Sequence, residues 1–168
     1  MHKVFVSNDR KIDIFMDSHD YSHIGQVADP NWENKIFNYY DKFDFDNLIF
    51  VDLGANIGCH TLFYYNFKKF DKLIYVEPNL KCVELFKKSL SVQKSYKENE
   101  EKVLILNNVV GEENGYLDLK VFKNNSGSGT IVDYFGKESK KNIMLMSHSE
   151  FNSSKIESLT ISNIYLLT

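Results

Sequence analysis

The sequence predicts an α/β fold with a mostly parallel sheet, and two observations support this prediction. Three continuous apolar runs, typical of strands buried on both faces, lie at 48–51, 73–76 and 103–106. Segments with helical spacing of apolar residues separate them, at 61–70 and 83–90. The order strand, helix, strand, helix, strand favours parallel strands joined by right-handed crossovers.

Shorter patterns predict the elements that flank this unit. Residues 4–6 and 12–15 are typical of two short strands separated by a polar turn. Asp29 before Pro30 predicts a helix start, with Asp as the N-cap and Pro at the first helical position. The pattern predicts a polar loop at 19–25 and a half-exposed strand at 116–122. It predicts a Gly/Ser/Asn loop at 124–130 and a final short helix or strand at 156–167.

Length and composition narrow the classes of protein. The 168 residues suit a single domain, spanning 1–168. A net charge of −3 argues against a general nucleic-acid binder, which would carry a basic surface. Only Cys59 and Cys82 are present, no apolar run is long enough to span a membrane, and the N-terminus lacks a signal-peptide core. We therefore expect a cytoplasmic protein without a nucleic-acid, membrane or metal partner.

A glycine-containing loop is predicted where the first apolar strand turns into a helix. Residues 51–58 read Val-Asp-Leu-Gly-Ala-Asn-Ile-Gly. Such a loop lets a cofactor approach the backbone and offers it free N–H groups at a helix N-terminus. A dinucleotide site requires G-x-G-x-x-G, whereas the chain has Gly54, Asn56 and Cys59 at those positions. The acidic Asp52 at the strand end favours a cofactor with a cationic methionine moiety, and asparagine tolerates the positive φ of a replaced glycine.

Glu77 is the second indication of a cofactor site. It ends the next predicted strand, 77 − 54 = 23 residues after the first glycine of the loop. An acidic side chain at this place can accept hydrogen bonds from ribose hydroxyls. This reasoning applies to S-adenosylmethionine as well as to NAD, because both contain adenosine.

Two motifs closely resemble the FkbM family of methyltransferases. The string Val51–Thr61 is similar to the glycine loop of that family, which characteristically reads Asp-x-Gly-Ala-Asn-x-Gly, and residues 76–79 match its Glu-Pro-Asn. The resemblance covers 30–132 and leaves 1–29 as an N-terminal hairpin and loop. Shorter similarities lie at 32–33, 106–115 and 125–127. The family implies a Rossmann-like class I methyltransferase fold and S-adenosylmethionine-dependent O-methylation of a hydroxyl on a sugar or small natural product.

The same resemblance implies roles for individual residues. The predicted S-adenosylmethionine-binding residues are Asp52, Gly54, Ala55, Asn56, Gly58, Glu77, Pro78, Asn107 and Asn108. The loop residues would line the methionine and ribose side of the cofactor, Glu77 would hold the ribose diol, and Asn107 or Asn108 would lie near the adenine. His60 is our candidate for the general base, and a surface histidine is the alternative.

The end of the sequence leaves other interpretations open. After a segment like 156–164, FkbM members continue to a strand reading Lys-Ile-Asp-x-Glu-Gly, so the resemblance implies a sheet that is incomplete on its C-terminal side. A non-catalytic S-adenosylmethionine-binding module or a truncated remnant is therefore one alternative, and an NAD-dependent enzyme is another. We also expect strand 48–53 to have an unpaired apolar edge, covered by residues 156–168 or by another chain in a homo-oligomer.

Overall fold

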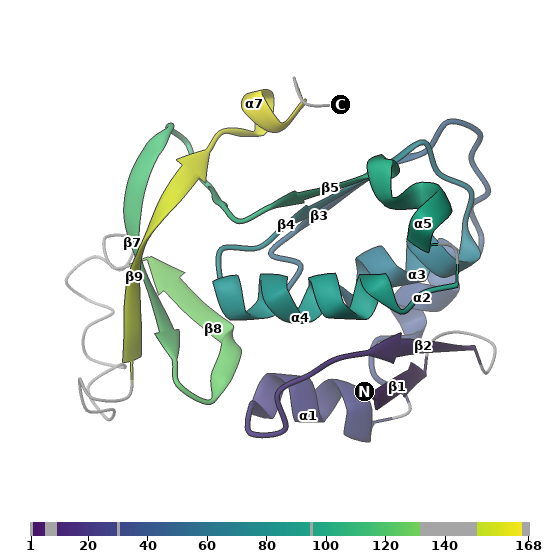
Figure 1. The fold of residues 1–168 in the computed structure, drawn as a ribbon, viewed down its shortest axis with the longest axis horizontal. Coiled ribbons are helices and arrows are strands. Elements are labelled where there is room, and N and C mark those ends of the chain that lie inside the picture. The colour runs from purple at the N-terminus through teal and green to yellow at the C-terminus, as the bar shows by residue number, and fades with distance from the viewer. Residues whose placement is uncertain (1, 6–9, 30, 95, 132–150, 166–168) are drawn as a thin grey trace.

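The protein is described by a computed structural model, and its described residues are 2–5, 10–29, 31–94, 96–131 and 151–165 (Figure 1). They form an α/β structure, as predicted. The elements, in chain order, are β1 (His2–Phe5), β2 (Lys11–Ile14), α1 (Tyr21–Ala28), α2 (Asn34–Tyr40), β3 (Ile49–Leu53), α3 (Cys59–Phe67), β4 (Lys72–Val76), α4 (Leu80–Ser91), α5 (Tyr96–Asn99), a 3₁₀ turn (Glu100–Lys102), β5 (Val103–Leu106), β6 (Val109–Val110), β7 (Gly115–Phe122), β8 (Asn125–Ile131), β9 (Phe151–Leu159) and α7 (Ile161–Tyr165).

A parallel sheet of order β3-β4-β5 forms the centre of the molecule. Val51 pairs with Ile74, and Tyr75 pairs with Ile105. Helices α3 and α4 connect the strands and lie on the same side of the sheet (Figure 1). All three strands were predicted from their apolar runs, and both helices from their spacing. Because parallel strands place their carboxyl ends at one edge, the loops after β3, β4 and β5 meet there.

A second sheet, of order β6-β9-β7-β8, follows the first along the chain. Strand β6 is parallel to β9, whereas β7 is antiparallel to both β8 and β9. Strands β1 and β2 form a separate antiparallel hairpin, as predicted. Among the described strands, three pairings are parallel and three are antiparallel. The central sheet is therefore parallel, as predicted, whereas the second sheet is mixed.

The predictions for the loop at 19–25 and for Asp29 were wrong, and Pro30 lies outside the described residues. The expected polar loop contains helix α1, whose N-cap is Asp20, with side-chain bonds from the backbone N–H groups of Ser22 and His23. Asp29, the predicted N-cap of the next helix, is instead the C-cap of α1. Helix α2 begins later, at Asn34. A short polar helix of this kind depends on its cap and its neighbours more than on its own pattern.

Of two predictions near the C-terminus, one was wrong and one was confirmed in the described residues. The Gly/Ser/Asn segment at 124–130 is largely strand β8, held by antiparallel pairing with β7. Residues 156–167 were expected to be a helix or a strand, and the structure contains both, because β9 extends to Leu159 and α7 follows it. Residues 132–150 lie outside the described part of the chain.

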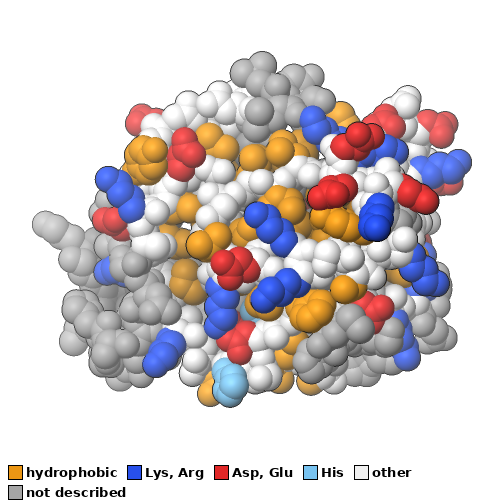
Figure 2. Space-filling model, in the orientation of Figure 1, with side chains coloured by type: hydrophobic (Ala, Val, Ile, Leu, Met, Phe, Trp, Pro, Cys, Tyr) orange, Lys and Arg blue, Asp and Glu red, His pale blue; other side chains and the backbone are white. Residues whose placement is uncertain are grey.

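The two faces of the parallel sheet differ in how they are covered. Its helix side packs into the main core, where Leu73 and Tyr75 are fully buried. On β3 the opposite face exposes Ile49, Val51 and Leu53, whose relative exposures are 45%, 38% and 47%. Apolar side chains are visible at the surface between α4 and α7, where Figure 1 places this sheet (Figure 2).

Strand β3 lies at the edge of its sheet, as expected. The predicted cover by residues 156–168 is wrong for 156–159, because β9 pairs with β6 and β7 instead. Residues 166–168 lie outside the described part of the chain. In the part that the structure describes, the helices are too short or too polar to cross a membrane.

Candidate functional site

The glycine loop joins β3 to α3 at the carboxyl end of the parallel sheet. Three of its residues adopt the left-handed backbone region, with φ of 71° at Gly54, 50° at Asn56 and 81° at Gly58. Asparagine is among the few non-glycine residues that enter this region at low cost. The inferred tolerance of Asn56 for a glycine conformation is therefore confirmed, and the loop keeps the tight path that the motif predicts.

Gly54 and Gly58 have different surroundings. A Cβ added to Gly54 would meet no atom within 4 Å, and the residue is exposed. A Cβ added to Gly58 would lie 2.2 Å from the Phe86 ring, an impossible contact. The Phe86 ring in turn stacks on Tyr75, with 3.9 Å between centroids. Gly58 thus lets α4 pack against the loop, while Gly54 leaves the backbone open to a ligand.

The main chain of Asn56 is hydrogen-bonded to Tyr75 in β4 and to Glu77, the residue that follows β4. The Asn56 N–H donates to Glu77 Oε2 at 2.8 Å, and the Tyr75 hydroxyl donates to the Asn56 carbonyl oxygen. Glu77 Oε1 accepts from the Asn79 N–H, also at 2.8 Å. Glu77 is 6% exposed, and this burial raises its pKa, although the two backbone hydrogen bonds oppose the rise. Each carboxylate oxygen keeps a second acceptor position.

The side chain of Asn56 points to residues that are distant in sequence. Its Oδ1 lies 3.0 Å from His23 Nε2 on α1, and its Nδ2 donates to Ser126 Oγ on β8 at 3.3 Å. His23 Nε2 also lies 2.9 Å from Ser126 Oγ. Cys82 Sγ on α4 donates to the same Asn56 oxygen. We call His23, Asn56 and Ser126 the loop anchor.

Asp52 caps helix α3 from the end of β3. The N-cap Gly58 has no side chain, and Asp52 Oδ2 accepts from both the backbone N–H and the hydroxyl of Thr61, at 3.1 and 2.6 Å. A carboxylate at a helix N-terminus is favoured by the helix dipole. Burial raises the pKa of Asp52, although the Thr61 bonds oppose this. The predicted acidic residue thus ties the two ends of the loop together.

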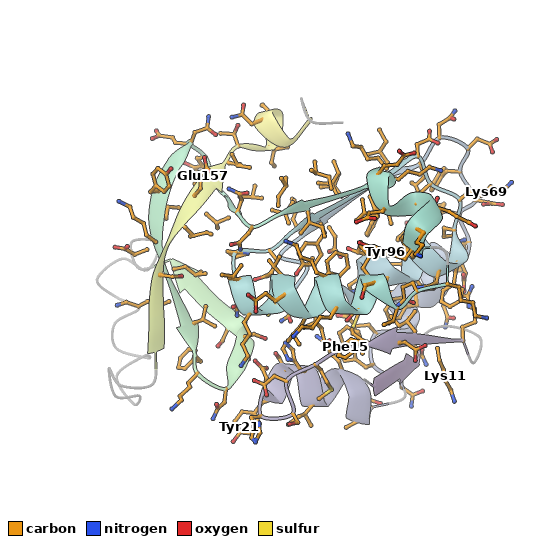
Figure 3. All side chains as sticks on the ribbon, in the orientation of Figure 1. Lys11, Phe15, Tyr21, Lys69, Tyr96 and Glu157 are labelled. Atoms are coloured by element: carbon orange, nitrogen blue, oxygen red, sulfur yellow. The ribbon has the colours of Figure 1, made fainter. Side chains whose placement is uncertain are left out.

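The other predicted cofactor residues divide into two groups. Ala55 and Pro78 lie in the loops after β3 and β4, and Asn107 Nδ2 donates to the carbonyl oxygens of Glu77 and Pro78, both at 2.9 Å. Asn108 instead donates to Glu157 Oε2 on β9 at 3.1 Å. Figure 3 labels Glu157. Asn107 therefore joins the site around Glu77, and Asn108 holds the second sheet.

His60, the candidate base, lies in the first turn of α3. Its Nε2 is 2.5 Å from Glu33 Oε2. Its ring stacks on Phe37, with centroids 5.1 Å apart, and meets Tyr40 edge-on. Its Nδ1 is buried and has no hydrogen-bond partner within the described residues. His60 is thus enclosed by aromatic rings and paired with a carboxylate, and its role as a base stays a prediction.

Several residues of this site were not found from the sequence. Tyr75 carries the only hydroxyl in its apolar run, and Thr61 stands in the first turn of a helix with a glycine cap, so both offered a local signal. His23 and Ser126 offered none, because they meet Asn56 across 33 and 70 positions of sequence.

Neither a metal site in the described residues nor a similar known protein indicates the function. In the part of the chain that the structure describes, no three or more His, Cys, Asp and Glu side chains are grouped as a metal site. No protein-family model matches the chain, and no significant match was found among curated proteins or solved structures. The function must therefore be argued from the loop, the buried glutamate and the open side of Gly54.

Proposed function

We propose that the protein binds S-adenosylmethionine at the carboxyl end of its parallel sheet and acts as a Rossmann-like class I methyltransferase on a small-molecule hydroxyl. The strongest support is the hydrogen bond between the glycine loop and Glu77, in which the Glu77 carboxylate lies 2.8 Å from the backbone nitrogen of Asn56. In open parallel sheets, ligands bind at this edge.

The residues fit an adenosine cofactor in two respects. The open space beside Gly54 leaves its backbone accessible, as close approach by a ligand requires. Glu77 uses one hydrogen bond on each oxygen for the protein and keeps acceptor capacity for a diol. When bound, S-adenosylmethionine would supply an activated methyl group. Asp52 and Glu77 provide the negative charge that a sulfonium cofactor favours over a pyrophosphate.

A second candidate function is non-catalytic binding of the same cofactor. The environment of His60 favours it, because Nε2 is paired with Glu33 and Nδ1 is buried. A base must reach the hydroxyl proton directly or through one water molecule. With a carboxylate on Nε2, the nitrogen left to accept a substrate proton is Nδ1, and it is buried beside the ring of Phe37.

Calorimetry with separate ligands tests the proposal. S-adenosylhomocysteine should bind, and NAD should bind far more weakly or not at all, because the loop has asparagine and cysteine at two of the dinucleotide glycine positions. Tight binding of NAD without binding of S-adenosylhomocysteine would refute it. Methyl transfer from labelled S-adenosylmethionine to a panel of sugars and small alcohols then separates an enzyme from a binding module.

Substitution of Glu77 tests its role in binding, and substitution of Glu84 is the matched control. Glu77→Ala should weaken S-adenosylhomocysteine binding by roughly tenfold or more, since a charge-assisted hydrogen bond contributes about 1.5–3 kcal/mol. Glu84→Ala, on the exposed side of α4, should leave the affinity unchanged. An unaltered dissociation constant in folded Glu77→Ala would assign Glu77 to the loop alone.

A further inference from the structure

The loop anchor connects the glycine loop to two elements that lie outside the β3–α3–β4 unit. His23 belongs to α1, which precedes the unit, and Ser126 belongs to β8, which follows it. Helix α1 also starts next to β8, where the Tyr21 N–H donates at 2.8 Å to the carbonyl oxygen of Asn124, the residue before β8. Figure 3 labels Tyr21 at the start of α1, near the turn between β7 and β8. The glycine loop is thus held by contacts with α1 and β8.

The hydrogen bonds fix the tautomer of His23. The backbone N–H of Asp17 donates to His23 Nδ1 at 3.2 Å, so Nδ1 is an acceptor and the ring proton is on Nε2. Nε2–H then donates to Asn56 Oδ1, or is shared with Ser126 Oγ. His23 is fully buried, and this burial lowers its pKa, against the opposing effects of Asp20, Asn56 and Asp17. The neutral ring is therefore the form that this geometry requires.

The chain of donors continues to a buried carboxylate. Ser22 Oγ donates to Asp20 Oδ1 at 2.6 Å, so its oxygen is available to accept from Ser126 Oγ, 3.0 Å away. Asp20 Oδ2 accepts from the Ser126 N–H at 2.8 Å. Burial raises the pKa of Asp20, but the bonds from Ser22 and Ser126 outweigh it, and the net pKa is lowered. A continuous hydrogen-bond network thus connects His23 through Ser126 and Ser22 to the Asp20 carboxylate.

We infer that His23 is a positioning residue for the proposed cofactor site, because it holds the Asn56 side chain and thereby the left-handed turn between Gly54 and Gly58. Lys81 and Cys82 of α4, Asp17 and Asp20 are the titratable groups that face it. Cys82 Sγ donates to Asn56 Oδ1 and faces the protonated Nε2 of His23, which cannot accept its proton, and burial raises the pKa of this thiol to about 12. The identity of the ligand in this inference rests on the proposed function. The hydrogen bonds of His23 within the loop anchor are present without a ligand.

Binding of S-adenosylhomocysteine by two variants tests the role of His23. His23→Leu removes the donor to Asn56, and its dissociation constant should rise about tenfold, the effect of one net hydrogen bond. His23→Gln keeps an N–H donor near the position of Nε2 and should restore most of the affinity. Equal affinity of His23→Leu and wild type would overturn the inference. Equal weakening in Ile14→Val would also overturn it, because this buried substitution in β2 lowers stability but removes no hydrogen-bonding group of the anchor.

Amide hydrogen exchange in the ligand-free protein provides the independent readout. His23→Leu should speed exchange at the Asn56 and Gly58 amides about tenfold relative to those of β4, and unchanged exchange there would overturn the inference. If His23→Leu does not fold, Ser126→Ala replaces it with the same expectations. Glu84→Ala, at an exposed residue of α4 outside the anchor, should change nothing. If the wild type binds no S-adenosylhomocysteine, the proposed function fails, and exchange alone decides the role of His23.

Discussion

Gly54 and Gly58 bound the same loop and share a positive φ, yet their surroundings are opposite. Space is open beside Gly54, whereas the Phe86 ring fills the position where a Gly58 side chain would lie. One glycine therefore serves access to the backbone, and the other serves the packing of a helix. The comparison teaches that the spacing of a motif does not assign a common reason to its glycines, because each neighbour imposes its own requirement.

The largest expected effect is that of Gly58→Ala. The added methyl group would overlap Phe86, and overpacking costs about 1–3 kcal/mol. The left-handed backbone adds about 1–2 kcal/mol for a residue with Cβ. We expect the free energy of unfolding, measured in urea, to fall by about 3 kcal/mol or more.

A double substitution separates the two contributions in Gly58→Ala. Adding Phe86→Leu removes the ring that the new methyl group meets, so the costs of the two changes should be less than additive. Strict additivity would mean that the backbone, and not the ring, determines the cost at Gly58. The comparison between the two glycines would then fail.

An intermediate effect is expected at Asn56, between the two glycines. Asn56→Gly retains the positive φ but removes the hydrogen bonds of the Asn56 side chain with His23 and Ser126, at a cost of about 1–3 kcal/mol. Asn56→Ala loses the partner and also strains the backbone, so it should cost about 1 kcal/mol more. Thermal unfolding of both variants measures the difference. If Asn56→Gly were as stable as wild type, the amide would contribute nothing to the loop.

The smallest effect on stability is expected at Gly54. Gly54→Ala meets no neighbour, so only the backbone conformation is penalised, by about 1 kcal/mol. Its methyl group would instead occupy the open space where a ligand would approach. Calorimetry should therefore show S-adenosylhomocysteine affinity reduced roughly tenfold or more, alongside nearly normal unfolding. The reverse pattern, a large loss of stability with normal affinity, would place Gly54 in the core beside Gly58.

Sequence reasoning succeeded where local pattern and local cause coincide. The runs at β3, β4 and β5 form strands as their apolar content predicts, although among the three only the run at β4 is buried throughout, and the glycine loop follows from its motif and its place after a strand. Asn56 was recognised as a tolerated replacement because backbone preference belongs to the residue itself. These features require no knowledge of the rest of the chain.

Sequence reasoning failed where a segment takes its structure from a distant partner. The Gly/Ser residues of β8 are extended because β7 pairs with them, and pairing overrides a weak strand preference. Helix α1 is short and polar, and it is fixed by Asp20 and by the contact of Tyr21 with the residue before β8. The role of His23 was missed for the same reason, since its partners lie 33 and 103 positions away.

The exposed side of β3 has a calorimetric consequence. Apolar surface raises the heat capacity only when it passes from the protein interior into water, and Ile49, Val51 and Leu53 are already about half in water in the folded state. Unfolding therefore adds less apolar hydration at β3 than at β4, where Leu73 and Ile74 are fully buried. The heat capacity increment per residue should lie below the usual value of about 12–15 cal/mol/K, and the curve of stability against temperature should be correspondingly flat.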